Sequence, residues 1–220
     1  MSEPTTPTFR VQVVDYDPSR ITTEDGELGW SLEPARCAVL VHDLLPYYVQ
    51  LLGPLARASV IEGSRGVIAW AGSRGVPVIA SAPRPADHPE QRGLGGRLWG
   101  LGPGRGDART SCLAELHAEE VPWVRKRSLS AFFATDLAVE LRRRGRDQLV
   151  IVGVFAGQGI LATTFDALAH DVEVFVVCDA VADYSEDLHV QAMRQVARST
   201  GQVMRLEELV GAVAEVANRE

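Results

Sequence analysis

The sequence of 220 residues is poor in cysteine and in aromatic side chains. Its three cysteines, Cys37, Cys112 and Cys178, are widely spaced and odd in number. This pattern argues against both a disulfide framework and a zinc site. Because a chain without disulfides suits a reducing compartment, we expect a cytoplasmic protein that carries no metal ion or other cofactor.

Dense positive charge and long apolar runs are also lacking. The formal net charge is −7, and nucleic-acid binding needs a basic surface that neutralises phosphates. No apolar run is long enough to span a bilayer. The stretch from Met1 to Arg20 lacks the apolar core of a signal peptide. We therefore expect neither a nucleic acid nor a membrane as a partner.

Short β-rich runs alternate with amphipathic helical stretches along the chain. Hydrophobic residues make up 46% of it, which is enough for one sizeable core. The patterns predict strands at 37–42, 78–80, 123–124, 148–152, 172–177 and 202–204, and helices at 55–74, 134–144, 159–170, 186–199 and from 206 onward. Such alternation predicts a single-domain three-layer α/β/α sandwich with a mainly parallel sheet. Residues 1–35 are predicted to form an extended N-terminal arm on the domain of residues 36–220.

Charged side chains follow three of the predicted strands. Ligands of an open parallel sheet bind beyond the carboxyl ends of its strands. Asp43 follows the first strand, Lys126 the third and Asp179 the fifth. The pattern alone leaves two interpretations open for each of the first two. Asp43 also fits a helix N-cap, and Lys126 also fits an ordinary surface lysine.

A glycine-rich turn and a long loop complete the candidate site. The stretch from Gly153 to Gly159 follows the fourth strand and holds three glycines in seven residues. Its backbone N–H groups, at a helix N-terminus, can hold an anion, although the pattern equally fits a tight strand-to-helix connection. The segment from Pro83 to Gly106 is long for a connection, which is typical of a functional loop.

Several sequence blocks occur in an order that resembles the isochorismatase (cysteine-hydrolase) superfamily. They are residues 30–34, 38–43, 90–94, 126, 130–133, 136–137, 145–150, 153–156 and 179–186. The match is closest to the phenazine-pathway branch, which hydrolyses 2-amino-2-deoxyisochorismate, and runs roughly from Trp30 to the C-terminus. The resemblance implies that residues 36–220 form an isochorismatase-like hydrolase domain. It also implies a homodimer, in which the arm could cross to a neighbour.

The resemblance assigns the catalytic roles to Asp43 and Lys126. Amidase members carry a nucleophilic cysteine at the start of the helix after the fourth strand, where this chain has Ile160. Covalent thiol catalysis is therefore disfavoured. Vinyl-ether hydrolysis needs an acid and no nucleophilic side chain, so Asp43 would be the general acid that protonates the enolpyruvyl methylene carbon. Lys126 would orient the substrate or the water.

The expected substrate is a small dicarboxylate, isochorismate or its 2-amino analogue, which would release pyruvate in the biosynthesis of a secondary metabolite such as an antibiotic. The resemblance implies a non-proline cis peptide at Val154-Phe155. Arg92 equally fits an arginine in a mobile loop. The residues that the resemblance places at the substrate are Arg92, Trp99, Val154, Phe155, Gly157, Gln158, Gly159 and Ile160.

Departures from the phenazine branch keep two alternatives open. Pro83 stands where that branch has glutamine, Leu129 where it has tyrosine, and Gly157-Gln158 replaces a His-containing pair. These changes motivate a non-catalytic binding or scaffold subunit with the same fold, or a cysteine-independent hydrolase of another small acid. His88 faintly resembles a zinc motif of nicotinamidases, but no second histidine follows nearby.

Overall fold

One parallel sheet forms the centre of the computed structural model, which describes residues 7–22, 28–116 and 120–217. Within these residues, six strands follow the order β3-β2-β1-β4-β5-β6, and every neighbouring pair is parallel. The strands are β1 (Cys37–His42), β2 (Val78–Pro83), β3 (Trp123–Lys126), β4 (Gln148–Val154), β5 (Glu173–Ala182) and β6 (Gln202–Met204). The predicted parallel sheet is confirmed, and its central strands β1 and β4 are buried throughout.

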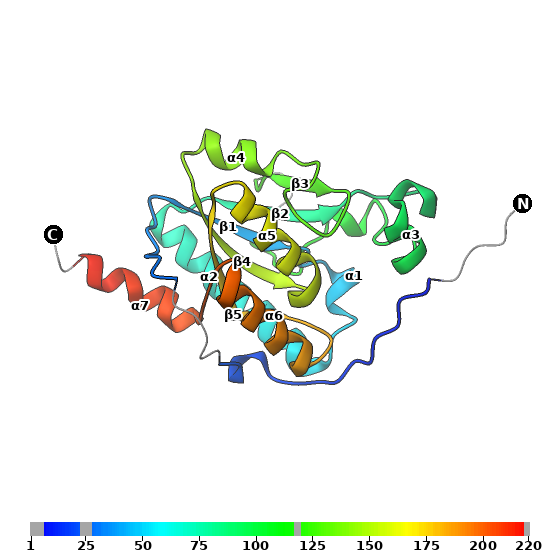
Figure 1. Cartoon of the computed structure of the whole chain (residues 1–220), viewed down its shortest axis with the longest axis horizontal. Coiled ribbons are helices and arrows are strands. Elements are labelled where there is room, and N and C mark those ends of the chain that lie inside the picture. The colour runs from blue at the N-terminus through cyan, green and yellow to red at the C-terminus, as the bar shows by residue number, and fades with distance from the viewer. Residues whose placement is uncertain (1–6, 23–27, 117–119, 218–220) are drawn as a thin grey trace, which may run out of the picture.

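Helices cover both faces of this sheet. The α-helices of the described residues are α1 (Pro46–Val49), α2 (Pro54–Arg74), α3 (Leu94–Trp99), α4 (Leu137–Arg143), α5 (Leu161–Ala169), α6 (Glu186–Ser199) and α7 (Leu206–Ala217). Helices α2 and α7 pack together on one face, and α5 and α6 pack together on the other (Figure 1). The predicted three-layer sandwich is therefore confirmed.

The described part of the N-terminal arm packs against the α/β domain of the same chain. Residues 7–22 form one short 3-10 turn, Pro18–Arg20, and are otherwise extended. Tyr16 and Ile21 are buried, and the Asp15 carboxylate accepts the free N–H groups of Leu55 and Ala56 at the start of α2. This carboxylate caps α2 and is favoured by the helix dipole. Residues 1–6 and 23–27 lie outside the described residues, and the homodimer stays a prediction.

The fifth strand extends beyond its predicted end, and this corrects the position of one charged residue. The predicted strand 172–177 is β5, Glu173–Ala182, whose pairing with β4 changes register between Ile151 and Gly153. Asp179 therefore lies inside the strand. Its Oδ1 accepts the N–H of Leu206 at 2.9 Å, away from the carboxyl end of the sheet. The residue that follows the strand is Asp183.

Local backbone geometry explains the other differences. The helix predicted from residue 134 begins at Leu137, because Ala134 has a φ of 54°, outside the helical region. The helix predicted from residue 159 is preceded by a π-helical turn, Ala156–Ile160. The long loop contains a 3-10 turn, Pro89–Arg92, and α3, which the glycines at 95 and 96 concealed in the sequence pattern.

Candidate active site

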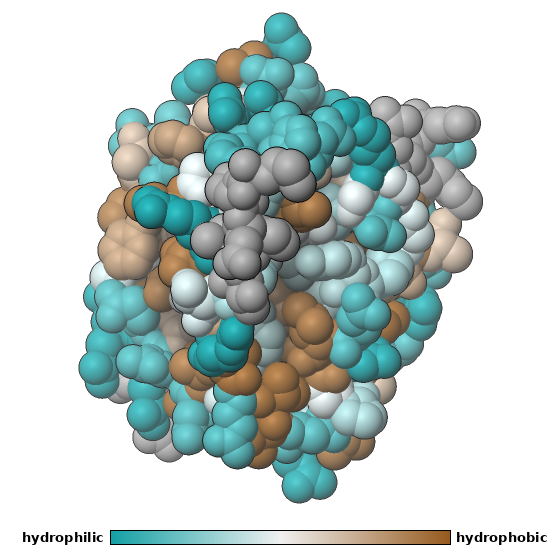
Figure 2. Space-filling view, turned by 90° about the vertical axis from the view of Figure 1, so that its right-hand side faces the viewer, coloured by the Kyte–Doolittle hydropathy of each residue, from teal (hydrophilic) through white to brown (hydrophobic). Residues whose placement is uncertain are grey.

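A cavity of about 630 Å³ lies beyond the carboxyl ends of β1 to β4. Figure 2 looks onto this side of the molecule, where apolar side chains gather among polar ones. The long loop supplies much of the wall, as its length predicted, and the N-terminal arm supplies Pro7 and Phe9. The size is within the range of sites for small organic ligands, roughly 300–1,000 Å³.

Asp43 lies on the floor of this cavity, directly after β1. Its φ is 49°, a left-handed conformation that aspartate tolerates better than most residues, and only 6% of the residue is exposed. The hydroxyl of Ser81, on β2, donates to Asp43 Oδ1 at 3.0 Å and accepts the Asp43 backbone N–H at 3.2 Å. Asp43 does not begin α1, whose N-cap is Leu45, so the alternative of a simple helix cap is wrong.

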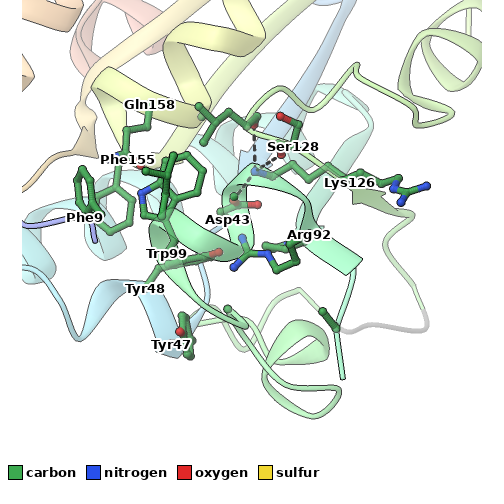
Figure 3. Close-up of a pocket in the computed structure, with 18 of the residues that line it drawn as sticks. Phe9, Asp43, Tyr47, Tyr48, Arg92, Trp99, Lys126, Ser128, Phe155 and Gln158 are labelled. Atoms are coloured by element: carbon green, nitrogen blue, oxygen red, sulfur yellow. Dashed lines mark hydrogen bonds and ion pairs between the residues drawn. The ribbon is translucent and has the colours of Figure 1, made fainter. Parts of the chain in front are cut away.

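Lys126 points at Asp43 from the end of β3 (Figure 3). Its Nζ lies 2.6 Å from Asp43 Oδ2, and the residue is 3% exposed. The ammonium also donates to the carbonyl oxygens of Leu129 at 3.0 Å and Ser128 at 3.4 Å. The alternative of an ordinary surface lysine is therefore wrong. Because two carbonyl groups also hold Nζ, the ammonium keeps acceptors even when the Asp43 carboxyl group is neutral.

His42 joins this pair to the turn after β4. Its Nδ1 lies 2.8 Å from the carbonyl oxygen of Val154, to which it donates, and 3.9 Å from Asp43 Oδ2. Burial lowers the pKa of His42 to about 4. The imidazole is therefore neutral near pH 7 and orients the strand end without adding charge.

The turn after β4 contains the expected cis peptide between Val154 and Phe155. Both residues line the cavity, as do Gln158 and Gly159. Ile160 and Gly157 do not: Ile160 is fully buried, and Gly157 is exposed, with its N–H directed to Asp183. Their expected contact with the substrate is thus not reproduced by the cavity lining, because the turn is π-helical and rotates them out of the wall.

Within the described residues, no thiol lines the cavity. Cys37 and Cys178 are buried, and Cys112 is half-buried. Burial raises the pKa of Cys37 and of Cys178 to about 12, and that of Cys112 to about 11. A nucleophilic cysteine must be a thiolate, so these side chains do not supply one to the site.

Arg92 and Trp99 both reach the cavity from the long loop. Arg92 lies beside Asp43 in Figure 3, and its Nη1 donates to the carbonyl oxygen of Gly100 at 2.6 Å. This bond holds the guanidinium against its own loop, and the substrate-binding role of Arg92 stays a prediction. Trp99 stands in an edge-on arrangement against Phe9, with ring centroids 6.2 Å apart.

Aromatic side chains form a wall that the sequence did not predict. Phe155 stacks on Tyr184 with ring centroids 4.2 Å apart, and Tyr48 meets Phe155 at 5.8 Å. Phe9 approaches Tyr184 at 6.0 Å. These residues come from four distant segments, so no local pattern could have united them. Burial raises the pKa of Tyr48 and of Tyr184 above the ordinary range, so both phenols are neutral.

Positive charge predominates among the ionisable lining residues. Asp43 is the one acid on the cavity wall within the described residues, whereas the cations are Arg84, Arg92, Lys126 and Arg127. Of the departures noted in the sequence, Pro83 and Leu129 line the cavity and make its wall more apolar. Such a site suits a small anion with an apolar body.

Neither a metal site nor a membrane span was found in the part of the chain that the structure describes. No group of three or more acidic, histidine or cysteine side chains is arranged to hold a metal ion there. Of the five histidines of the chain, His117 lies outside the described residues and is not covered by this statement. No described helix is both long and apolar enough to cross a membrane.

Comparison with known proteins places this geometry in a family. The isochorismatase domain matches residues 37–208. The chain belongs to the isochorismatase family. A Pseudomonas chlororaphis protein named "Probable isochorismatase" is 36% identical over 82% of this chain and 88% of its own length. The "Phenazine biosynthesis protein PhzD1" of Pseudomonas aeruginosa gives the same three values. The relatives support a hydrolase of isochorismatase type.

Solved structures agree on the fold. A cysteine hydrolase from Pseudomonas syringae pv. phaseolicola 1448A has a TM-score of 0.74 to this chain and is 19% identical, covering 89% of this chain and 99% of its own. At that identity, the likeness concerns the fold alone. The family resemblance expected from the sequence blocks is confirmed by the domain match and by the relatives.

Proposed function

We propose that this isochorismatase-family protein hydrolyses the enolpyruvyl vinyl ether of isochorismate or of 2-amino-2-deoxyisochorismate. The products would be pyruvate and a dihydro-hydroxy-benzoate or the corresponding anthranilate. The observation that carries the proposal is the buried Asp43–Lys126 pair, at 2.6 Å, on the floor of a cavity without a thiol. The names of the relatives, an isochorismatase and a phenazine biosynthesis protein, support the substrate class.

The reaction needs one proton donor and one water. The Asp43 carboxyl group transfers its proton to the methylene carbon of the enolpyruvyl group, and the adjacent ether carbon becomes an oxocarbenium ion. Water adds to that carbon and returns a proton to the Asp43 carboxylate. The resulting hemiketal breaks its bond to the ring oxygen, giving pyruvate and the ring alcohol. No covalent enzyme intermediate forms.

Asp43 must hold a proton when the substrate is bound. The substrate brings two carboxylates into a cavity whose wall carries Lys126 and Arg92. The carbonyl oxygens of Leu129 and Ser128 hold the Lys126 ammonium in that state. Lys126 can then orient the water or bind a substrate carboxylate, and Arg92 supplies a second cation.

Pyruvate release from both substrates tests this proposal. Wild type should release pyruvate with saturation kinetics, and Asp43→Asn should not, because an amide cannot donate the proton. Asp187→Asn, an exposed change in the first turn of α6, is the matched control and should behave as wild type. Release by Asp43→Asn at a rate within about two-fold of wild type would contradict the assignment of the acid.

An alternative substrate is favoured by one observation. Pro83 and Leu129 line the cavity where the phenazine branch has polar side chains. They fit a cysteine-independent hydrolase of another small acid, and a screen of small dicarboxylates would detect it. The third candidate, a non-catalytic binding or scaffold subunit, would show saturable binding of these acids without turnover.

A further inference from the structure

A buried carboxylate stands behind the active-site wall. Asp183, directly after β5, is 2% exposed. Its Oδ2 accepts the N–H of Gly157 at 2.6 Å, and its Oδ1 accepts the N–H of Tyr184 at 2.7 Å. Within the described residues, no lysine or arginine pairs with it. Burial raises the pKa of Asp183, since these N–H groups replace hydration only in part. Such a carboxylate is costly to bury, so a hydrophobic side chain would serve packing better.

The bond to Gly157 fixes the turn that carries the cavity wall. Gly157 belongs to the π-helical turn that leads into α5, where the partial positive charge of a helix start favours an anion. A Cβ on Gly157 would lie 3.1 Å from Asp183 Oδ2, so this close approach suits glycine. The next two residues, Gln158 and Gly159, line the cavity. The position of Asp183 therefore sets the position of that wall.

Tyr16, from the N-terminal arm, fixes Asp183 from the other side. The Tyr16 hydroxyl accepts the backbone N–H of Asp183 at 2.9 Å and lies 2.8 Å from Nδ1 of His189. Burial lowers the pKa of His189 to about 4, so its ring is neutral near pH 7 and Nδ1 accepts the hydroxyl proton. All three residues are buried. The hydrogen bonds thus run from α6 and the arm to the turn without interruption.

We propose that Tyr16 and Asp183 are positioning residues for the substrate-binding turn of residues 154–159. The arm holds Asp183, and Asp183 holds the N–H of Gly157 and thereby places Gln158 and Gly159. The same segment places Tyr184, whose ring stacks on Phe155. The kinetic part of this inference rests on the proposed function, whereas its structural part does not.

Hydrogen exchange at the turn tests the structural part. In Tyr16→Phe the ring stays but the hydroxyl is lost, so peptides covering residues 154–160 should exchange about 10-fold faster, while β1 peptides stay protected. Ser19→Ala is the matched control, because it removes an exposed hydroxyl of the same arm, which bonds the Asp17 carboxylate at 2.7 Å and contacts neither Tyr16 nor Asp183. It should leave exchange at the turn unchanged.

Kinetics test the consequence for the site. Tyr16→Phe should raise KM for the substrate about 10-fold, because a misplaced binding wall weakens ground-state and transition-state contacts alike. The kcat value and its pH profile should stay near those of wild type, since Asp43 and Lys126 bond neither Tyr16 nor Asp183 and are held by Ser81 and by the carbonyl groups after β3. Gly157→Ala should likewise raise KM and speed hydrogen exchange at the turn. Gly72→Ala, where a Cβ meets nothing within 4 Å, is its control.

The outcomes separate this inference from the proposed function. Unchanged exchange at the turn in both Tyr16→Phe and Gly157→Ala, with unchanged KM, would overturn the positioning role. If wild type released no pyruvate, the proposed function would fail, and the exchange measurement would still decide the structural part. Asp183→Asn, if it folds, should give the largest increase in exchange, because its amide nitrogen cannot accept an N–H.

Discussion

The ends of two neighbouring strands, β1 and β4, have opposite chemical characters. At the end of β1, Asp43 contacts Lys126 and Ser81 on the cavity floor. Beyond the end of β4, Ile160 is fully buried outside the cavity, at the position where the resemblance to the family predicts the nucleophile of amidase members. One strand end places ionisable groups at the cavity, and the other contributes Ile160 to the hydrophobic core.

In the proposed reaction, the β1 end supplies the proton through Asp43, and the β4 end supplies no nucleophile. An amide needs a nucleophile that can form an acyl intermediate, whereas a vinyl ether is activated by protonation of carbon. A cavity wall without a thiol is therefore consistent with the proposed hydrolysis of a vinyl ether. The β4 end instead forms part of the cavity wall through residues 154–159.

The largest predicted effect comes from removing the acid at the β1 end. Asp43→Asn should lower kcat for pyruvate release by about 10³-fold, within the range usual for general acid catalysis. The change is nearly isosteric and keeps an acceptor for Ser81, but it leaves the buried Lys126 ammonium without its counter-charge, so urea unfolding should show lower stability and is needed to confirm that the variant is folded. A coupled assay for pyruvate measures kcat. Activity within a factor of about two of wild type would remove Asp43 from the mechanism.

Removing the cation at the same end should have the next largest effect. Lys126→Met keeps the length of the side chain and loses the charge, so kcat/KM should fall about 10²-fold. Because the two residues act together, Asp43→Asn combined with Lys126→Met should be no worse than Asp43→Asn alone. Losses that multiply in the double variant would instead mean that the two residues act independently.

Low pH should lower the free energy of unfolding through His42, which links the ends of β1 and β4. His42 bonds the Val154 carbonyl, and burial lowers its pKa to about 4 from its ordinary value of 6.5. Between those values the unfolded chain binds a proton and the native chain does not, so stability falls as pH falls. His42 should contribute roughly 3 kcal/mol to the loss measured by urea unfolding from pH 7 to pH 4. Burial also lowers the pKa of His189 to about 4, so His189 should add a similar loss, and His42→Asn should reduce this dependence without removing it. An unchanged slope in His42→Asn would contradict the role of His42.

The smallest predicted effect comes from placing a thiol after β4 in the variant Ile160→Cys. Ile160→Cys places it in the core, where desolvation opposes a thiolate. Pyruvate release should stay within about two-fold of wild type, and hydrolysis of simple aromatic amides should not appear. An iodoacetamide-sensitive amidase activity in this variant would show that the β4 end still supports covalent catalysis, which the comparison denies.

The sequence predicted those features that depend on local pattern or on the family blocks. Asp43 follows the apolar run of β1, Lys126 ends the short strand β3, and the cis peptide at Val154-Phe155 was expected from the family blocks. Asp179 was misplaced because the register change in β5 depends on its pairing with β4, which no single segment encodes.

The remaining site residues depend on contacts between distant segments. Ser81 is a small polar residue inside an apolar strand, and only the neighbouring β1 makes it a partner of Asp43. Phe9 and Tyr16 lie in an arm without regular structure, so periodicity offered no signal for them. Asp183 did fall within a family block, and its position directly after β5 could have been found had the end of that strand been known.

The most direct test of the account is the rate of pyruvate release by a variant without cysteine. Cys37→Ala, Cys112→Ala and Cys178→Ala would be combined in one chain and measured beside wild type and Asp43→Asn, with isochorismate and its 2-amino analogue. The account predicts that the cysteine-free chain, once shown to be folded, keeps kcat within about three-fold of wild type, whereas Asp43→Asn loses about 10³-fold. A folded cysteine-free chain without activity, beside an active Asp43→Asn, would contradict it.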